Sequence, residues 1–235
     1  MCDQEWARVT TSSRISDQTS PDSTKLGEWL FRHRTALPLP IAGVILGLHI
    51  GEAASSTILV TAGVALTAAG ELIRLWGVRH IGAVSRTRSD RLGPLVATGP
   101  FALIRNPLYV GNILIWVGFA LSARLVWFAP LIMLLLGAEY HAIVRWEESL
   151  LMARLGDAYR DYAARVPRWI PRFASARPST GSGRAVTSPL MVSRSNHEHS
   201  SSGDHFSWRD TLFSERGTLI AIAVGYLMLW LKLRT

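Results

Sequence analysis

The sequence of 235 residues predicts an all-α fold, a polytopic membrane helical bundle of two helical hairpins plus a C-terminal apolar helix. The first observation is four apolar stretches of about 17–20 residues, the length that crosses the hydrocarbon core of a bilayer. The second is that 25 Lys and Arg face 17 Asp and Glu although the mean hydropathy is +0.20, so apolar and basic residues must be segregated. The third is that basic and apolar segments alternate along the chain.

The predicted elements follow in order. Residues 1–25 are polar and rich in Ser and Thr, which predicts a disordered tail with no cleavable signal peptide. The apolar stretches 36–54 and 57–76 are divided by two serines, which predicts a tight antiparallel hairpin. The stretches 107–123 and 125–144 are divided by Arg124 alone and predict a second hairpin. Residues 26–173 are therefore expected to form one membrane-embedded core.

The chain after this core divides into two further segments. Residues 174–205 are rich in Ser, with scattered Arg and Pro, and predict a flexible linker. Residues 206–235 contain the last apolar stretch, 217–233, which is short. It can cross the bilayer as a tilted helix or lie in the interface.

The positions of the basic residues predict the topology. Five Lys or Arg precede residue 36, five lie in residues 77–106 and eleven in residues 145–216, whereas residues 55–56 carry none. The positive-inside rule places these three basic segments, and so the N-terminus, in the cytoplasm. The net charge of +8 is then explained by topology and anionic lipid rather than by nucleic acid. A soluble helical protein is disfavoured, because the chain has too little polar surface to cover four apolar stretches.

Two polar runs flank the second hairpin, at residues 91–111 and 145–171. Because a hairpin brings its two ends together, both runs are expected to line one cavity at the cytoplasmic surface. Each residue type also has a structural interpretation. Asn106 and Pro107 suit the start of a helix, and Arg105 suits an anchor for lipid phosphate. Consecutive carboxylates at 147 and 148 suit either a solvated helix turn or a cavity that binds ligand hydroxyls or an ammonium group.

Arg145 has two interpretations, an ion pair with Glu148 on one helix face or a site for a substrate anion. Further on, five side chains repeat at helical spacing and predict an amphipathic helix that closes over the cavity or lies on the membrane: Leu151, Leu155, Tyr159, Tyr162 and Val166. Glu71 and Arg74 are three residues apart and are expected to pair. The segment 196–199 has metal-ligand residue types but no cysteine partner, and no metal site is predicted.

The two runs together resemble the isoprenylcysteine carboxyl methyltransferase and phospholipid methyltransferase families of integral membrane enzymes. The resemblance covers residues 70–172. The positions that match the pattern are Leu95, Val96, Gly99, Phe101, Arg105, Asn106, Pro107, Tyr109, Gly111, Glu147, Glu148, Leu151, Gly156, Tyr159, Tyr162, Val166, Pro167, Ile170 and Pro171. At the position of Asn106 the family often has His, and at that of Ile143 some members have Arg.

This resemblance implies that S-adenosylmethionine binds in a pocket at the cytosolic face. The cofactor-binding residues that it implies are Leu95, Val96, Phe101, Asn106, Pro107, Leu108, Tyr109 and Glu147. The catalytic residues that it implies are Arg145, Arg105 and Tyr109, with Arg145 orienting the polar group of the acceptor.

The implied reaction is methyl transfer to a lipid-like or prenylated acceptor. A carboxylate acceptor is favoured over an amine, because a carboxylate is ionised at pH 7 and needs no general base. Prenylated cysteine, phosphatidylethanolamine and small amphipathic acids all stay open as acceptors. Two other classes compete with this prediction: an NADPH-dependent membrane reductase similar to steroid reductases, and a membrane anchor or assembly factor without enzymatic activity. The paired glutamates and the Val-Pro-x-x-Ile-Pro ending favour the methyltransferase.

Overall fold

In the computed structural model, the described residues are 21–54, 56–82, 95–171 and 207–234. The predicted linker 174–205 and residues 1–20 of the predicted tail lie outside them. The all-α class is confirmed, since the described residues contain helices and no strand. The elements are α1 (Pro21–His33), α2 (Leu39–Gly47), α3 (Thr57–Ile81), the short 3-10 helix η2 (Gly99–Ala102), α4 (Pro107–Ser122), α5 (Phe128–Leu155), α6 (Asp157–Arg165) and α7 (Trp208–Lys232).

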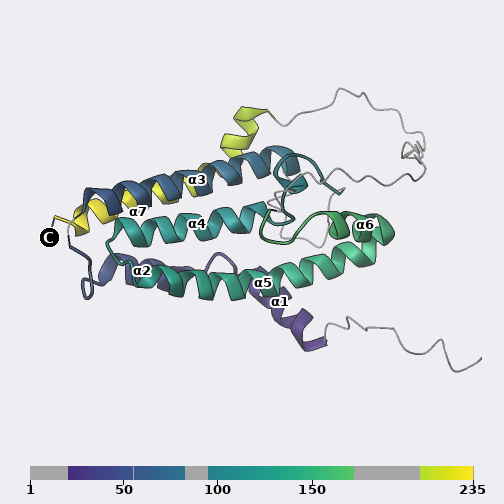
Figure 1. Cartoon of the computed structure of the whole chain (residues 1–235), viewed down its shortest axis with the longest axis horizontal. Coiled ribbons are helices and arrows are strands. Elements are labelled where there is room, and N and C mark those ends of the chain that lie inside the picture. Colours follow the sequence, from purple (N-terminus) through teal and green to yellow (C-terminus); the bar gives the residue numbers. More distant parts are fainter. Residues whose placement is uncertain (1–20, 55, 83–94, 172–206, 235) are drawn as a thin grey trace, which may run out of the picture.

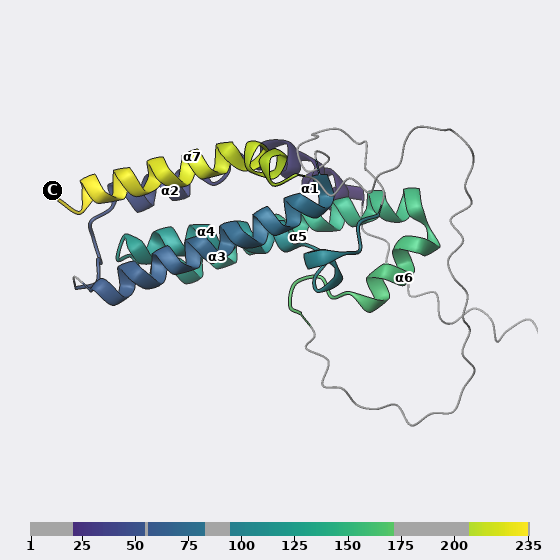
Figure 2. The same cartoon turned by 90° about the horizontal axis from the view of Figure 1, so that it is seen from above.

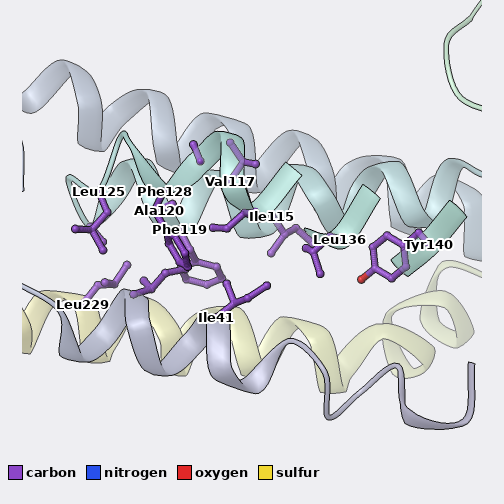
Figure 3. Packing of buried hydrophobic residues seen from close by; sticks show 14 of the residues in the cluster. Ile41, Ile115, Val117, Phe119, Ala120, Leu125, Phe128, Leu136, Tyr140 and Leu229 are labelled. Atoms are coloured by element: carbon purple, nitrogen blue, oxygen red, sulfur yellow. The ribbon is translucent and has the colours of Figure 1, made fainter. Parts of the chain in front are cut away.

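The long helices form two layers (Figures 1 and 2). One layer holds α3, α4 and α5, and the other holds α7 and α2, with α1 packed against α5. Apolar side chains fill the space between the layers: Ile41 of α2 and Leu229 of α7 face Phe119 of α4 (Figure 3). The helices α3, α5 and α7 are long and apolar enough to cross a bilayer, and α4 is a shorter apolar helix of 16 residues. These lengths confirm the prediction of a membrane helical bundle.

The first predicted hairpin differs from the structure. Helix α2 has only nine residues, so the stretch 36–54 is not one membrane-spanning helix. The chain turns at residues 34–38, Pro40 is the second residue of α2, and the helix ends at Gly47, after which Leu48 is extended. Proline and glycine both oppose a continuous helix, although neither lowers the hydropathy of the stretch enough to reveal it. Helix α2 packs on α7, and α3 packs mainly on α4.

The second predicted hairpin is confirmed. Helices α4 and α5 pack together, and the connection between them contains Arg124, whose φ of 63° is left-handed. Helix α5 continues past the predicted end at residue 144 to Leu155, and α7 begins at Trp208, before the predicted start at residue 217. The predicted amphipathic helix 151–166 is two helices, because Gly156 at φ 53° separates α5 from α6.

Glycines allow the backbones of α3 and α4 to touch. A Cβ atom placed at Gly70 would lie 2.6 Å from the carbonyl oxygen of Gly111, and one at Gly63 would lie 2.6 Å from that of Gly118. Small residues at such positions let two membrane helices approach closely. Gly111, which the family pattern contains, therefore serves helix packing.

We expect Gly111→Val to destabilise the protein by about 1–3 kcal/mol, because the new side chain must push the two helices apart. A Cβ at Gly111 would lie 2.7 Å from the carbonyl oxygen of Gly70. Thermal unfolding of the purified variant in detergent measures the effect. Gly137→Val on α5 is the matched control, since a Cβ there meets no atom within 4 Å. Equal unfolding temperatures for both variants would contradict the packing role of Gly111.

A polar network ties the last turn of α7 to the loop that follows α2. The Lys232 ammonium group donates to the carbonyl oxygens of Ile45 at 2.9 Å and Leu48 at 2.5 Å, and it pairs with Glu52 at 3.0 Å. Glu52 also pairs with Arg124 at 2.6 Å. The carbonyl groups at the end of α2 lack partners within their own helix, so Lys232 satisfies them from α7.

The Glu52 pairs predict a pH-dependent stability. Burial opposes ionisation, but the hydrogen bond and charge of Lys232 and the charge of Arg124 outweigh it and hold the pKa of Glu52 below its usual value. A carboxylate with a lowered pKa stabilises the fold at neutral pH and loses that contribution as the pH falls through the lowered pKa. We therefore expect Glu52→Gln to lower the unfolding temperature at pH 7 and to resemble the parent protein in acid. A difference that stays constant with pH would contradict this role.

Candidate functional site

The two polar runs meet at the end of the bundle where α4 begins. The backbone N–H of Arg105 donates to the carbonyl oxygen of Pro167 at 2.9 Å. The Asn106 side-chain amide donates to the carbonyl oxygen of Arg168 at 3.2 Å. The hydroxyl of Tyr162 on α6 donates to the carbonyl oxygen of Phe101 at 2.8 Å. These bonds place residues 101–106 against α6 and the segment 166–171.

Glu148 is held between two arginines. Its carboxylate pairs with Arg105 at 2.8 Å and accepts two hydrogen bonds from Arg168, at 3.1 Å and 2.5 Å. The side chain of Glu148 is 14% exposed, as is that of Arg105. Each arginine comes from a different segment, so Glu148 fixes the loop before α4 and the segment after α6 to α5.

Of the two interpretations of Arg145, the ion pair with Glu148 is wrong. The carboxylate of Glu148 is taken by arginines that approach from two other segments, and its bidentate contact with Arg168 is the more favourable geometry. Arg145 is half-buried on α5, and its side chain makes no ion pair or hydrogen bond to any residue that the structure describes.

Glu147 lies beside Tyr109. The Tyr109 hydroxyl donates to Glu147 Oε1 at 3.0 Å, and the Tyr109 ring stacks on Tyr140 with the ring centroids 4.8 Å apart. Asn112 of α4 accepts a hydrogen bond from Arg74 of α3. Within the described part of the chain, Glu147 has no arginine or lysine partner at ion-pair distance. Its second carboxylate oxygen is therefore available to a ligand, whereas Glu148 is already neutralised.

The remaining predicted cofactor residues lie in the segment before α4 or in its first turn, where Pro107 and Leu108 lie next to Gly77 of α3. Asn106 precedes α4, but its side chain does not cap the helix and instead joins the two runs. Leu95 packs on Tyr159, Tyr162 and Val166. The other positions are buried or half-buried: Val96, Phe101, Pro107 and Leu108.

Helix α6 covers this end of the molecule with the predicted apolar face. Tyr159, Tyr162 and Val166 form its buried cluster, and Leu151 and Leu155 pack against them. Burial raises the pKa of Tyr162 to about 12, so its hydroxyl stays protonated and donates to the Phe101 carbonyl.

Sequence reasoning missed several residues that shape the site. Arg168 lies within the Val-Pro-x-x-Ile-Pro ending, at a position where the pattern allows any residue. The pattern therefore assigns no role to Arg168. Asn112 and Tyr140 lie one turn or more inside apolar helices. Arg34 follows α1, its guanidinium packs on the Phe31 ring, and its charge acts on Glu147. For Asn112 and Tyr140, the signal in the sequence is that each is a polar residue within a predicted apolar stretch.

Comparison with known proteins adds a family. The profile of the phospholipid methyltransferase family matches residues 58–158, from α3 into α6. The nickel-cobalt-cadmium resistance protein NccN of Alcaligenes xylosoxydans xylosoxydans is 30% identical over 158 residues, which cover 65% of this chain and 71% of the relative. The cobalt-zinc-cadmium resistance protein CzcN of Cupriavidus metallidurans is 26% identical over 175 residues, 72% of this chain and 78% of the relative. No solved structure matches the chain.

Within the described residues, no three His, Cys, Asp or Glu side chains gather as a metal site. The segment 196–199 lies outside those residues. The family match instead covers the helices that carry both halves of the site: α4 with Tyr109, and α5 with Glu147 and Glu148. The chain belongs to the phospholipid methyltransferase family, as its resemblance to that group of membrane methyltransferases predicts.

Proposed function

We propose that this membrane methyltransferase uses S-adenosylmethionine and transfers its methyl group to the carboxylate of a lipid-like or prenylated acceptor at the cytoplasmic membrane face. One observation carries the proposal. Glu148 is neutralised by Arg105 and Arg168, whereas the adjacent Glu147 faces Tyr109 and keeps one carboxylate oxygen for a ligand. The pair thus divides into a structural carboxylate and a binding carboxylate.

The residues around Glu147 fit the cofactor. S-adenosylmethionine supplies a methyl group on a sulfonium centre, together with ribose hydroxyls and an ammonium group. A half-buried carboxylate such as Glu147 accepts hydrogen bonds from hydroxyl or ammonium donors, and the Tyr109 hydroxyl holds it in place. The apolar side chains that we assign to the adenine are Leu95, Phe101 and Leu108. Arg105 acts as a positioning residue, because it holds Glu148 and so fixes the turn of α5 that carries Glu147.

Arg145 is the proposed acceptor-binding residue. Its guanidinium makes no ion pair within the described part of the chain, and it stands two residues before Glu147 on α5. A guanidinium binds a carboxylate through two parallel hydrogen bonds and so orients its oxygen atoms. An ionised carboxylate needs no base, so alignment of the acceptor is the main contribution that the protein must make.

Turnover with labelled S-adenosylmethionine and an acceptor panel tests this function. We expect label in a farnesylated cysteine with a free carboxylate, and none in its methyl ester, which offers no carboxylate oxygen for transfer. Arg145→Gln is expected to raise the KM for the acceptor at least tenfold and to leave S-adenosylmethionine binding unchanged. Label in phosphatidylethanolamine alone would replace the carboxylate with an amine acceptor.

The cytoplasmic orientation rests on the three basic segments, because two of them flank the site. The exposed residue Asp161 on α6 offers a test. In a Cys2→Ser background, we expect the cysteine of Asp161→Cys to react with a membrane-impermeant thiol reagent only after the cells are permeabilised. Labelling of intact cells would reverse the orientation.

A further inference from the structure

A second polar feature lies between α3 and α7, in a cavity whose lining contains neither Glu147 nor Glu148. A cavity of about 270 Å³ opens there, and its lining includes Thr67 and Glu71 of α3 and Tyr226 of α7. The rest of the lining is apolar. Both helices are candidate membrane spans, so the cavity faces the region that lipid occupies. The two helices separate toward the end of α7 (Figure 2).

Glu71 is the unusual member of this lining. Glu71 is only 6% exposed, and neither of its carboxylate oxygens accepts a hydrogen bond from any residue that the structure describes. The predicted ion pair of Glu71 with Arg74 is confirmed. Arg74 Nε lies 3.6 Å from Glu71 Oε2, which is too far for a hydrogen bond. A carboxylate in an apolar membrane setting without a donor is costly.

Arg74 is engaged elsewhere. Its guanidinium pairs with Glu215 of α7 at 2.5 Å and donates to Asn112 and to Thr218. The carboxylates of Glu71 and Glu215 share the single positive charge of Arg74, so the three side chains carry one excess negative charge. The nearby hydroxyl groups are also engaged, because Tyr226 bonds to Thr67 at 2.9 Å and to Ser122 at 3.2 Å.

We propose that this cavity binds an amphipathic amine, with the ammonium group donating to Glu71 and the apolar body packing between α3 and α7. An ammonium group brings a positive charge and up to three N–H donors, which match the excess charge and the two unbonded oxygens of Glu71. The apolar lining, which includes Val64, Ala68 and Leu219, suits an alkyl or aromatic body. This site goes beyond the proposed methyl transfer, since α7 lies outside the part matched to the family.

The test uses the full-length protein in phosphatidylcholine nanodiscs and counts bound molecules by native mass spectrometry. The probes are dodecylamine, dodecanol and dodecyltrimethylammonium. We expect dodecylamine to bind with one molecule per chain, and the other two to bind at least tenfold more weakly, because one lacks the charge and the other lacks the N–H donors. Glu71→Gln is expected to weaken dodecylamine binding at least tenfold and to leave S-adenosylmethionine binding unchanged. Equal binding of all three probes would overturn the proposal.

A second pair of variants keeps the test valid if Glu71→Gln does not fold. Ala68→Phe fills the cavity from α3 and is expected to abolish dodecylamine binding. Ala69→Phe is the matched control, since Ala69 is an exposed neighbour outside the lining, and binding should persist. Dodecylamine binding that survives in Ala68→Phe would overturn the proposal.

Discussion

Glu147→Gln is expected to weaken binding of S-adenosylmethionine by ten- to a hundredfold. The reason is that the variant loses a charged acceptor, which is worth about 1.5–3 kcal/mol per hydrogen bond. Glutamine keeps the size of the side chain and can still accept from the Tyr109 hydroxyl, which lies 3.0 Å from Oε1 in the parent protein. Because the Glu148 pairs are untouched, the fold should persist. Calorimetry on the purified protein in detergent measures the affinity, and thermal unfolding checks the fold.

Glu139→Gln is the matched control for this variant. Glu139 is a half-buried carboxylate on the same helix, α5, and it has no ion pair within the described residues. Its replacement should leave S-adenosylmethionine binding unchanged. If both variants bind the cofactor like the parent protein, Glu147 is not a cofactor residue.

Glu148→Gln is expected to destabilise the protein by about 3–5 kcal/mol, because it leaves two guanidinium groups without their carboxylate in a half-buried site. Arg105 and Arg168 both lose their partner, so the loop before α4 and the segment after α6 lose a shared attachment to α5. The unfolding temperature in detergent measures this loss. It should fall far below that of Glu147→Gln.

The two glutamate variants together test whether Glu148 stabilises the fold while Glu147 binds the cofactor. Glu148→Asp keeps the charge and is expected to recover part of the stability that Glu148→Gln loses. If Glu148→Gln unfolds like the parent protein but no longer binds S-adenosylmethionine, then Glu148 contacts the cofactor directly, and its assignment as the structural member is wrong.

Hydropathy predicted the helices that are long and apolar. Helices α3, α4, α5 and α7 each cover all or most of a predicted stretch, and the hairpin of α4 and α5 follows from its short connection. The stretch 36–54 failed because its average hydropathy hides the two prolines and the glycines that confine α2 to nine residues. Only the order of residues along the chain, not their average, contains that information.

The site was predictable as a neighbourhood but not as a set of contacts. The hairpin explains why residues 105–109 lie near residues 147–148. The partner of Glu148 could not be predicted, because Arg168 reaches it only after Gly156 turns the chain into α6. Helical spacing on α5 alone suggested Arg145, and that choice ignored segments packed from elsewhere.

The contacts of α7 could not be predicted from local sequence patterns either. Arg74 pairs with Glu215, and Lys232 pairs with Glu52, across most of the chain length. No local pattern connects these residues. The predicted start of the last helix at residue 217 also excluded Glu215, since the polar first turns of α7 do not raise the hydropathy.

The most direct test of the central claim is equilibrium binding of S-adenosylmethionine and of NADPH to the full-length protein, measured by calorimetry in the same detergent. The account predicts binding of S-adenosylmethionine at micromolar concentrations, with no heat from NADPH. Tight NADPH binding without a response to S-adenosylmethionine would contradict the account and favour a reductase, and binding of neither compound would favour a membrane protein without this enzymatic activity.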